Sequence, residues 1–138
     1  MAPYTLGSFF MIKFNLPLEI QISKNKKFIL NLNNYRNTHY QSLNKSKVNY
    51  SEEVKSILGD IQETFNQVRL IYTYFPKDKR KRDISNICSI VDKYFCDALV
   101  DLGLIPDDNF DHVKEVTYRF GEIDKNNPRV EVVIEPIN

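Results

Sequence analysis

Acidic side chains and one lysine are spaced around a single predicted helix in a pattern that can do chemistry. Apolar residues between positions 84 and 102 repeat at about 100° per residue, the period of an α-helix. Asp83 stands at the N-cap position, where a carboxylate accepts free backbone N–H groups. Lys93 and Asp97 fall together on the polar side at i and i+4, and the Asp107-Asp108 pair follows the helix.

These groups fit metal-dependent hydrolysis of a phosphodiester. That reaction needs a nucleophilic water, neutralisation of the phosphate charge and help for the leaving oxygen, and Mg²⁺ held by carboxylates supplies all three. We expect Mg²⁺ (with Mn²⁺ as a substitute) at Asp83, Asp97, Asp107 and Asp108, with Lys93 as the catalytic cation. The alternatives stay open: an N-cap for Asp83, a turn for the Asp107-Asp108 pair, and a solvated ion pair for Lys93 with Asp97.

The charge distribution indicates a nucleic-acid partner, although the net charge is only +1. Five basic residues crowd into positions 77–82, and acids gather between positions 92 and 111. The polar stretch 31–49 is predicted to be an irregular loop, either a plain surface loop or one that holds phosphates and bases. The predicted DNA contacts are Asn34, Arg36, Lys45, Lys47, Lys79, Arg80, Lys81, Arg82 and Asn86.

The remaining elements predict one domain over residues 1–138. Strands are expected over 9–22 with a break at Pro17, from Phe28 onward, over 67–75 and over 110–122. A final hairpin returns at 129–134 after a turn at 125–128. A helix is expected to start near Ser51, and the helix from position 84 to end at Gly103. The fold class is therefore α+β, a mixed β-sheet with two main helices packed on it.

Several sequence features indicate the cellular location of the protein and exclude some kinds of site. Cys88 and Cys96 are eight residues apart on the predicted helix, about 12 Å along its axis, which excludes a disulfide between them. No apolar run is long enough for a membrane span, and the start of the chain lacks the basic n-region of a signal peptide, so a cytoplasmic protein with no membrane partner is expected. No Cys/His spacing indicates zinc. Asp92 is interpreted as a surface residue.

The chain resembles the RusA-type Holliday-junction endonucleases of phages and prophages along most of its length. The most specific matches are Arg82-Asp83 with Asn86, and Asp97-Ala98-Leu99 followed by Gly103 and Asp107-Asp108. The resemblance implies a RusA-like fold and a homodimer that cuts four-way DNA junctions with Mg²⁺. It also implies action in recombination or replication, in the cytoplasm of a bacterial host if a phage encodes the protein.

The resemblance also assigns roles to individual residues. Asp83 resembles the first catalytic aspartate of the family, and Asp108 the catalytic aspartate that is second in its pair. The family's catalytic lysine corresponds to Lys93 when counted back from Asp97, and to Ser89 when counted forward from Asp83. Ser85 stands where the family commonly has a second acid. Two alternatives therefore accompany the nuclease hypothesis: a junction-binding protein without activity, and a small interaction or inhibitor protein on the same fold.

Overall fold

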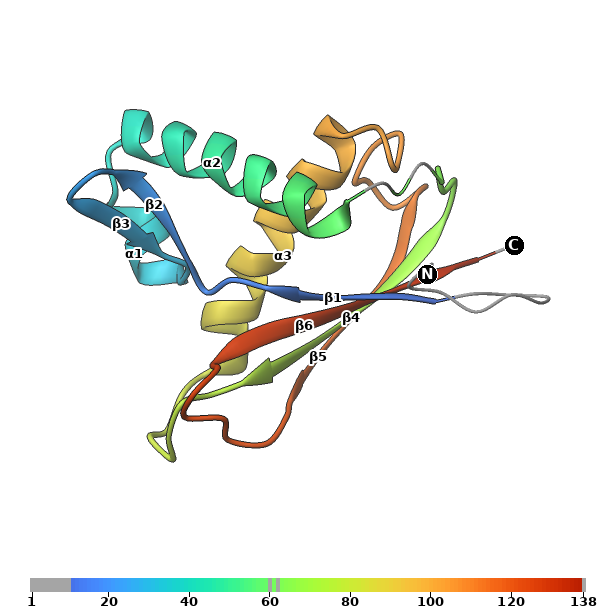
Figure 1. Ribbon diagram of the computed structural model, residues 1–138. Coiled ribbons are helices and arrows are strands. Elements are labelled where there is room, and N and C mark those ends of the chain that lie inside the picture. Colours follow the sequence, from blue (N-terminus) through green and yellow to red (C-terminus); the bar gives the residue numbers. More distant parts are fainter. Residues whose placement is uncertain (1–10, 60, 62, 138) are drawn as a thin grey trace.

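The structure is a computed structural model that describes residues 11–59, 61 and 63–137. Its elements, shown in Figure 1, run in the order β1 (Ile12–Leu16), β2 (Glu19–Ser23), β3 (Lys26–Ile29), α1 (Leu32–Asn37), α2 (Tyr40–Leu58), β4 (Val68–Phe75), α3 (Ile84–Asp101), β5 (Val113–Phe120) and β6 (Arg129–Pro136). The predicted break at Pro17 separates β1 from β2. The first residues of that predicted strand, Phe9 and Phe10, lie outside the described residues.

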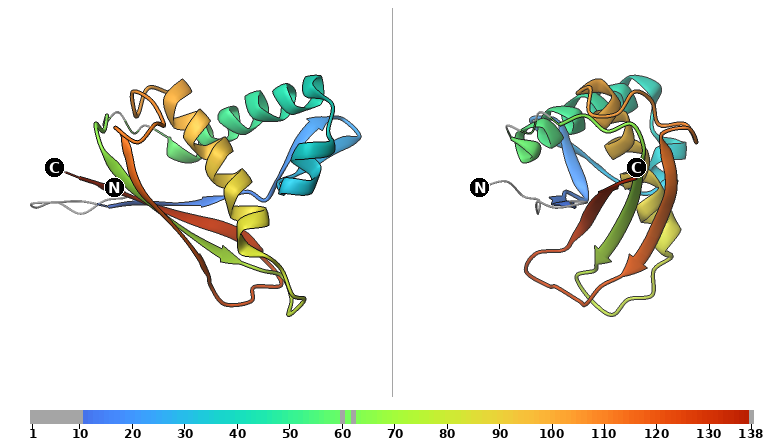
Figure 2. Two further views of the ribbon diagram at one scale, coloured as in Figure 1. Left: turned by 180° about the vertical axis from the view of Figure 1, so that it is seen from behind. Right: turned by 90° about the vertical axis from the view of Figure 1, so that its right-hand side faces the viewer.

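A mixed four-stranded sheet with the order β1-β6-β4-β5 forms one layer of the molecule. β4 pairs in parallel with β5 and antiparallel with β6, while β1 pairs antiparallel with β6. Residues along β4 alternate between buried and half-buried, because α2 and α3 lie over only one face of the sheet (Figure 2). The α+β class and the mixed sheet are thus as predicted, and a third, short helix and a separate β2–β3 ribbon are added.

The predicted hairpin of the last two strands is wrong. Both strands exist, but β4 lies between β5 and β6, so residues 121–128 cross the end of β4 instead of forming a tight turn. The crossover through α3 makes β4 and β5 parallel neighbours, which leaves the other edge of β4 for β6. Val68, Leu70 and Tyr72 of β4 are fully buried, as suits a strand with a partner on each side.

Helix α3 forms where it was predicted and packs against the sheet with its apolar stripe. Its buried residues include Val91, Phe95 and Leu99. The helix stops as expected, since Gly103 has φ = +78°, a left-handed conformation that glycine adopts without strain. Cys88 and Cys96 are both buried and free, in agreement with the prediction of no disulfide. None of the helices in the described part of the chain is long and apolar enough to cross a membrane.

The prediction of an irregular loop over 31–49 is wrong, because this stretch forms α1 and the first half of α2. Asparagine here caps a helix: the Asn31 side chain accepts a hydrogen bond from the backbone N–H of Asn34 at 2.7 Å. The helix expected from Ser51 begins at Tyr40 instead. Its polar first half is helical because it packs on α3, and such tertiary contacts override weak local propensity.

A cluster of aromatic rings around Tyr94 joins the two halves of the structure. The ring of Tyr94 stacks on Phe28 of β3, with centroids 5.8 Å apart, and meets Tyr35 of α1 and Tyr50 of α2 edge-on. Its hydroxyl hydrogen-bonds the fully buried Ser46 of α2 at 2.7 Å. Residues 19–50, which we call the N-terminal lobe, are held against α3 by this cluster and project beyond the sheet (Figure 1).

Asp92 was predicted to be a surface residue, and this prediction is wrong: its side chain is half-buried and connects α3 to the sheet. Its carboxylate accepts hydrogen bonds from the hydroxyl of Tyr72 at 2.6 Å and that of Tyr118 at 3.2 Å, and from the thiol of Cys96 at 3.3 Å. The buried position of Tyr72 raises the pKa of its phenol, and the neighbouring thiol and carboxylate raise it further. Asp92 sits at the edge of the helix, where sequence periodicity does not separate solvent from the adjoining strand β5.

Replacement of Asp92 by asparagine is expected to destabilise the fold. The amide keeps one acceptor oxygen but puts an NH2 group in place of the other, so at least one of the three donors loses its charged acceptor, at a cost of about 1–3 kcal/mol. Urea unfolding of Asp92→Asn against the natural chain measures the loss. Asp111→Asn, at an exposed position, is the matched control and should change the free energy of unfolding by less than about 0.5 kcal/mol. Equal stability of Asp92→Asn and the natural chain would show that these hydrogen bonds do not stabilise the packing of α3 on the sheet.

Candidate functional site

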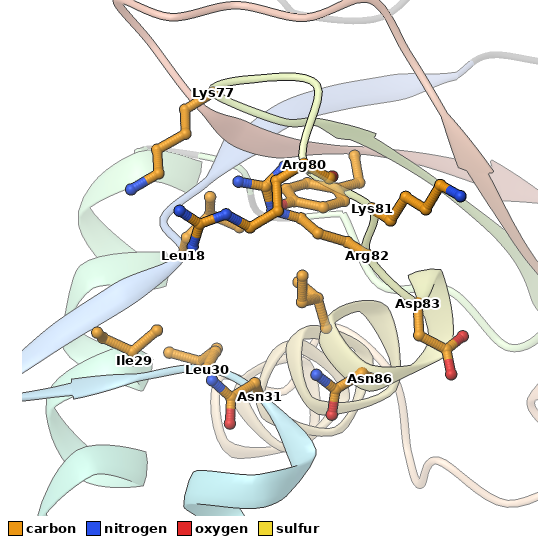
Figure 3. A pocket seen from close by; sticks show the side chains of 12 residues that line it. Leu18, Ile29, Leu30, Asn31, Lys77, Arg80, Lys81, Arg82, Asp83 and Asn86 are labelled. Carbon is orange, nitrogen blue, oxygen red and sulfur yellow. Dashed lines mark hydrogen bonds between the residues drawn. The ribbon is translucent and has the colours of Figure 1, made fainter.

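A basic cleft opens at the N-terminal end of α3, between the 77–82 loop and the start of α1. It has a volume of about 430 Å³. Figure 3 shows the basic side chains on one side, from the loop after β4, and the amides of Asn31 and Asn86 on the other. Its lining residues, which define the basic cleft, are Leu18, Ile29, Leu30, Asn31, Tyr74, Lys77, Arg80, Lys81, Arg82, Asp83, Asn86 and Ile87. Cations beside amide donors are a suitable lining for phosphate oxygens.

Arg82 fixes the conformation of the 77–82 loop, which carries the other cations of the cleft. Arg82 forms a salt bridge with Asp78 at 2.7 Å and donates to the backbone carbonyls of Asp78 and Arg80. A hydrogen bond from the backbone N–H of Arg80, followed by the Arg82 guanidinium, holds the pKa of the Asp78 carboxyl below its usual value. Arg82 therefore braces the loop, and the exposed Lys77, Arg80 and Lys81 are the cations left for a ligand.

The predicted DNA contacts divide into two groups. Arg80, Lys81, Arg82 and Asn86 line the basic cleft, and Lys79 is exposed on the same loop without lining it. The contacts predicted in 31–49 lie elsewhere. Arg36 and Lys45 are exposed on α1 and α2, while the side-chain amide of Asn34 donates to the carbonyl of Ile29 and supports the fold.

Lys77 and Asn31 are among the residues of the cleft that sequence reasoning missed. Lys77 belongs to the basic run that the sequence already shows, so the run itself carried the information. Asn31 reaches the cleft only because α1 starts beside α3. No local pattern in the sequence indicates that contact.

Asp83 lies at the rim of the basic cleft. It occupies the N-cap position of α3 as predicted, but its carboxylate makes no capping hydrogen bond and instead accepts from the hydroxyl of Ser85 at 3.3 Å. Figure 3 shows the carboxylate turned away from Arg80 and Lys77. Asp83 is exposed, so its oxygens are accessible to a ligand from solvent.

A second, acidic pocket lies at the other end of α3. It has a volume of about 290 Å³, and its lining residues are Lys47, Val48, Asp97, Val100, Asp101, Asp107 and Asp108. Part of this carboxylate set is used locally. Asp107 accepts from the backbone N–H of Asp108 at 2.7 Å and from the amide of Asn109 at 3.1 Å, and Asp101 accepts from Ser51. Among the described residues, the carboxylates of Asp97 and Asp108 accept no such hydrogen bond; Asp108 is exposed and Asp97 is half-buried.

Asp97 is the most perturbed carboxylate of the acidic pocket. Partial burial raises the pKa of Asp97 above the usual 3.8, and the charges of Asp108 and Asp101 raise it further, against the opposing effect of Lys93 and Lys47. Carboxylates crowded in this way are stabilised by a bound cation.

The two lysines near Asp97 share one aromatic ring. The ammonium groups of Lys47 and Lys93 lie 5.5 Å and 5.9 Å from the ring centroid of Tyr35, in cation–π contact. The structure thus places Lys47, a predicted DNA contact, in the acidic pocket. Tyr35 was not among the predicted site residues, and it became part of the site because α1 packs on α3.

One chain does not bring together all four predicted metal ligands. Asp97 is joined by Asp107 and Asp108, but Asp83 is fourteen helical residues away from Asp97, about 20 Å along the axis of α3. Within the described residues, no group of three or more His, Cys, Asp or Glu side chains is already arranged to hold a metal ion. A rigid helix keeps its two ends apart, so one chain does not form a centre that uses Asp83 together with Asp97.

No protein-family model matches this chain, and no curated protein is significantly similar to it. The assignment of a function therefore depends on the residues of the basic cleft and the acidic pocket.

The raised pKa of Asp97 predicts a pH-dependent stability difference. The folded state holds the carboxyl proton of Asp97 more tightly than the unfolded state does. Protonation of Asp97 therefore stabilises the fold below about pH 4, and this stabilisation is lost as the pH rises through the raised pKa. Asp97→Asn, which stays neutral, should gain stability relative to the natural chain between pH 4 and pH 7. Urea unfolding of both proteins without divalent ions measures this difference. The prediction would be contradicted if the free energy of unfolding of the natural chain increased relative to that of the variant as the pH rises.

Proposed function

We propose that the protein is a Mg²⁺-dependent, structure-selective endonuclease that acts as a homodimer on four-way junctions or other branched DNA. The observation that supports it is the polarity of α3, which carries a basic cleft at one end and a four-carboxylate pocket at the other. A protein that binds and cuts a polyanion uses both kinds of group, because cations hold the phosphates and carboxylates hold the metal ion.

The chain's own residues divide the work between the two sites. The exposed cations of the basic cleft hold the DNA backbone; these are Lys77, Arg80 and Lys81. Asn31 and Asn86 donate to phosphate oxygens. In the acidic pocket Asp97 and Asp108 supply hard oxygen ligands of the kind that Mg²⁺ prefers, and Asp107 contributes when its local hydrogen bonds open. A bound Mg²⁺ would activate water and neutralise phosphate charge.

Lys93 is the proposed catalytic cation. Its charge acts on Asp97 and its ammonium group rests on the Tyr35 ring, so it is positioned at the border of the acidic pocket. There it would stabilise negative charge that develops on the phosphate or on the leaving oxygen. Lys47, on the same ring, provides a second positive charge.

Asp83 is proposed to act across the dimer. One chain keeps it about 20 Å from Asp97, so it would complete the acidic pocket only of the partner subunit. A two-fold dimer then contains two equivalent centres, each with the partner's Asp83, which matches the paired incisions that a symmetric junction requires.

Loss of a metal ligand should remove cutting without removing binding. With Mg²⁺, the natural chain is expected to nick a synthetic four-way junction in two symmetric strands, and Asp108→Asn to lower that rate on the order of 100-fold or more. Denaturing gels measure nicking, and mobility shifts in EDTA measure binding, which the variant retains. The control Asp111→Asn leaves both unchanged. Cutting that persists in excess EDTA would refute the metal mechanism.

Mixing two inactive variants tests the position of Asp83. If each centre draws Asp83 from the partner subunit, a heterodimer of Asp83→Asn with Asp108→Asn contains one intact centre and nicks single strands of the junction. Re-annealed mixtures of the two variants should therefore recover part of the activity that each lacks. A mixture as inactive as its components would show that the residues do not act in shared centres.

A second candidate is a junction-binding protein without nuclease activity. Ser85 in place of an acid, and the separation of Asp83 from Asp97, favour it. This candidate predicts salt-sensitive junction binding, because each phosphate contact releases counterions, with no nicking at any Mg²⁺ or Mn²⁺ concentration. The junction assay with the natural chain separates the two functions.

A further inference from the structure

An exposed pair of aromatic rings marks the turn between α1 and α2. Tyr40 is 64% exposed, although tyrosine commonly buries its ring against the core. Its centroid lies 4.7 Å from the ring of His39, which is held in turn by a hydrogen bond from the backbone N–H of Gln41. The ring of Tyr40 is therefore supported on one side and open to solvent elsewhere.

The N-terminal lobe around this pair is strongly basic. Residues 19–50 contain six basic residues and a single acidic one, Glu19, which is paired with Lys27 at 3.0 Å. Lys24, Arg36 and Lys45 are exposed and have no acidic partner in the described part of the chain. A chain of net charge +1 thus concentrates positive charge on one lobe, and a polyanion is the ligand that this charge fits.

The aromatic pair is linked to the basic cleft by one short helix. Asn31 lines the cleft and caps α1, whose six residues rise by about 9 Å to the turn that carries His39 and Tyr40. A DNA strand whose phosphates lie in the cleft can therefore reach the aromatic pair within a few nucleotides. Arg36, in the last turn of α1, lies on this path.

We infer that Tyr40, supported by His39, stacks on a base whose face is exposed at the branch point of the DNA and so selects branched DNA over continuous duplex. A flat aromatic face binds a base only when that base is free of its own stack, whereas lysine and arginine bind the phosphates of any DNA. This inference rests on the proposed function and adds the group that reads the structure of the substrate.

The test uses the full chain in EDTA, where no cutting occurs, with two probes. One is a synthetic four-way junction that carries 2-aminopurine beside the branch point, and the other is a linear duplex of the same sequence. Tyr40→Ala should bind the junction roughly 5- to 100-fold more weakly, bind the duplex as before and lose the change in 2-aminopurine fluorescence. Tyr40→Phe keeps the ring and should behave as the natural chain does.

Two further variants complete the design. Phe110, which follows the Asp107-Asp108 pair, is 80% exposed. Phe110→Ala removes this other exposed ring and should leave binding to both probes unchanged. Arg36→Ala should weaken binding to junction and duplex alike and flatten the salt dependence. Loss of junction and duplex binding in equal measure for Tyr40→Ala, or of neither, would overturn the inference while the proposed function stands. A natural chain that binds neither probe would overturn both.

Discussion

The arrangement of both sites depends on the packing of Tyr94 at the centre of α3. Its ring contacts β3, α1 and α2, and its hydroxyl meets the buried Ser46. Burial raises the pKa of the Tyr94 phenol to about 12, so it keeps its proton across the physiological range and remains a hydrogen-bonding partner. This packing holds the N-terminal lobe on α3 and thereby places Asn31 at the basic cleft and Lys47 at the acidic pocket.

Helix α3 acts as a rigid spacer between two chemical environments. Cations and amides gather at its N-terminal end and carboxylates at its C-terminal end, with Lys93 between them. The sheet fixes one side of this helix through Asp92 and its two tyrosines, while the N-terminal lobe fixes the other. Because a helix does not bend to unite its ends, the basic cleft and the acidic pocket of one chain stay apart.

The sequence predicts the position of a candidate residue correctly when its partners are close to it in the chain. The Asp97, Asp107 and Asp108 grouping was predicted, since a helix end and the turn after it are neighbours in sequence and in space. Asp83 was expected in the same centre, and the rise of the helix separates it. Asp92 was misplaced for a different reason: its partners, Tyr72 and Tyr118, come from strands 20 and 26 residues away.

The sequence by itself determined α3, its Gly103 end, the strands of the sheet and the basic run after Pro76, because periodicity, capping and charge are local properties of a chain. Only the tertiary structure decided that β4 separates β5 from β6, that the asparagine-rich stretch is helical, and that Tyr35 joins Lys47 to Lys93. These depend on contacts between residues far apart in sequence, whose packing energy exceeds the weak local preferences of asparagine and of short alternating strands.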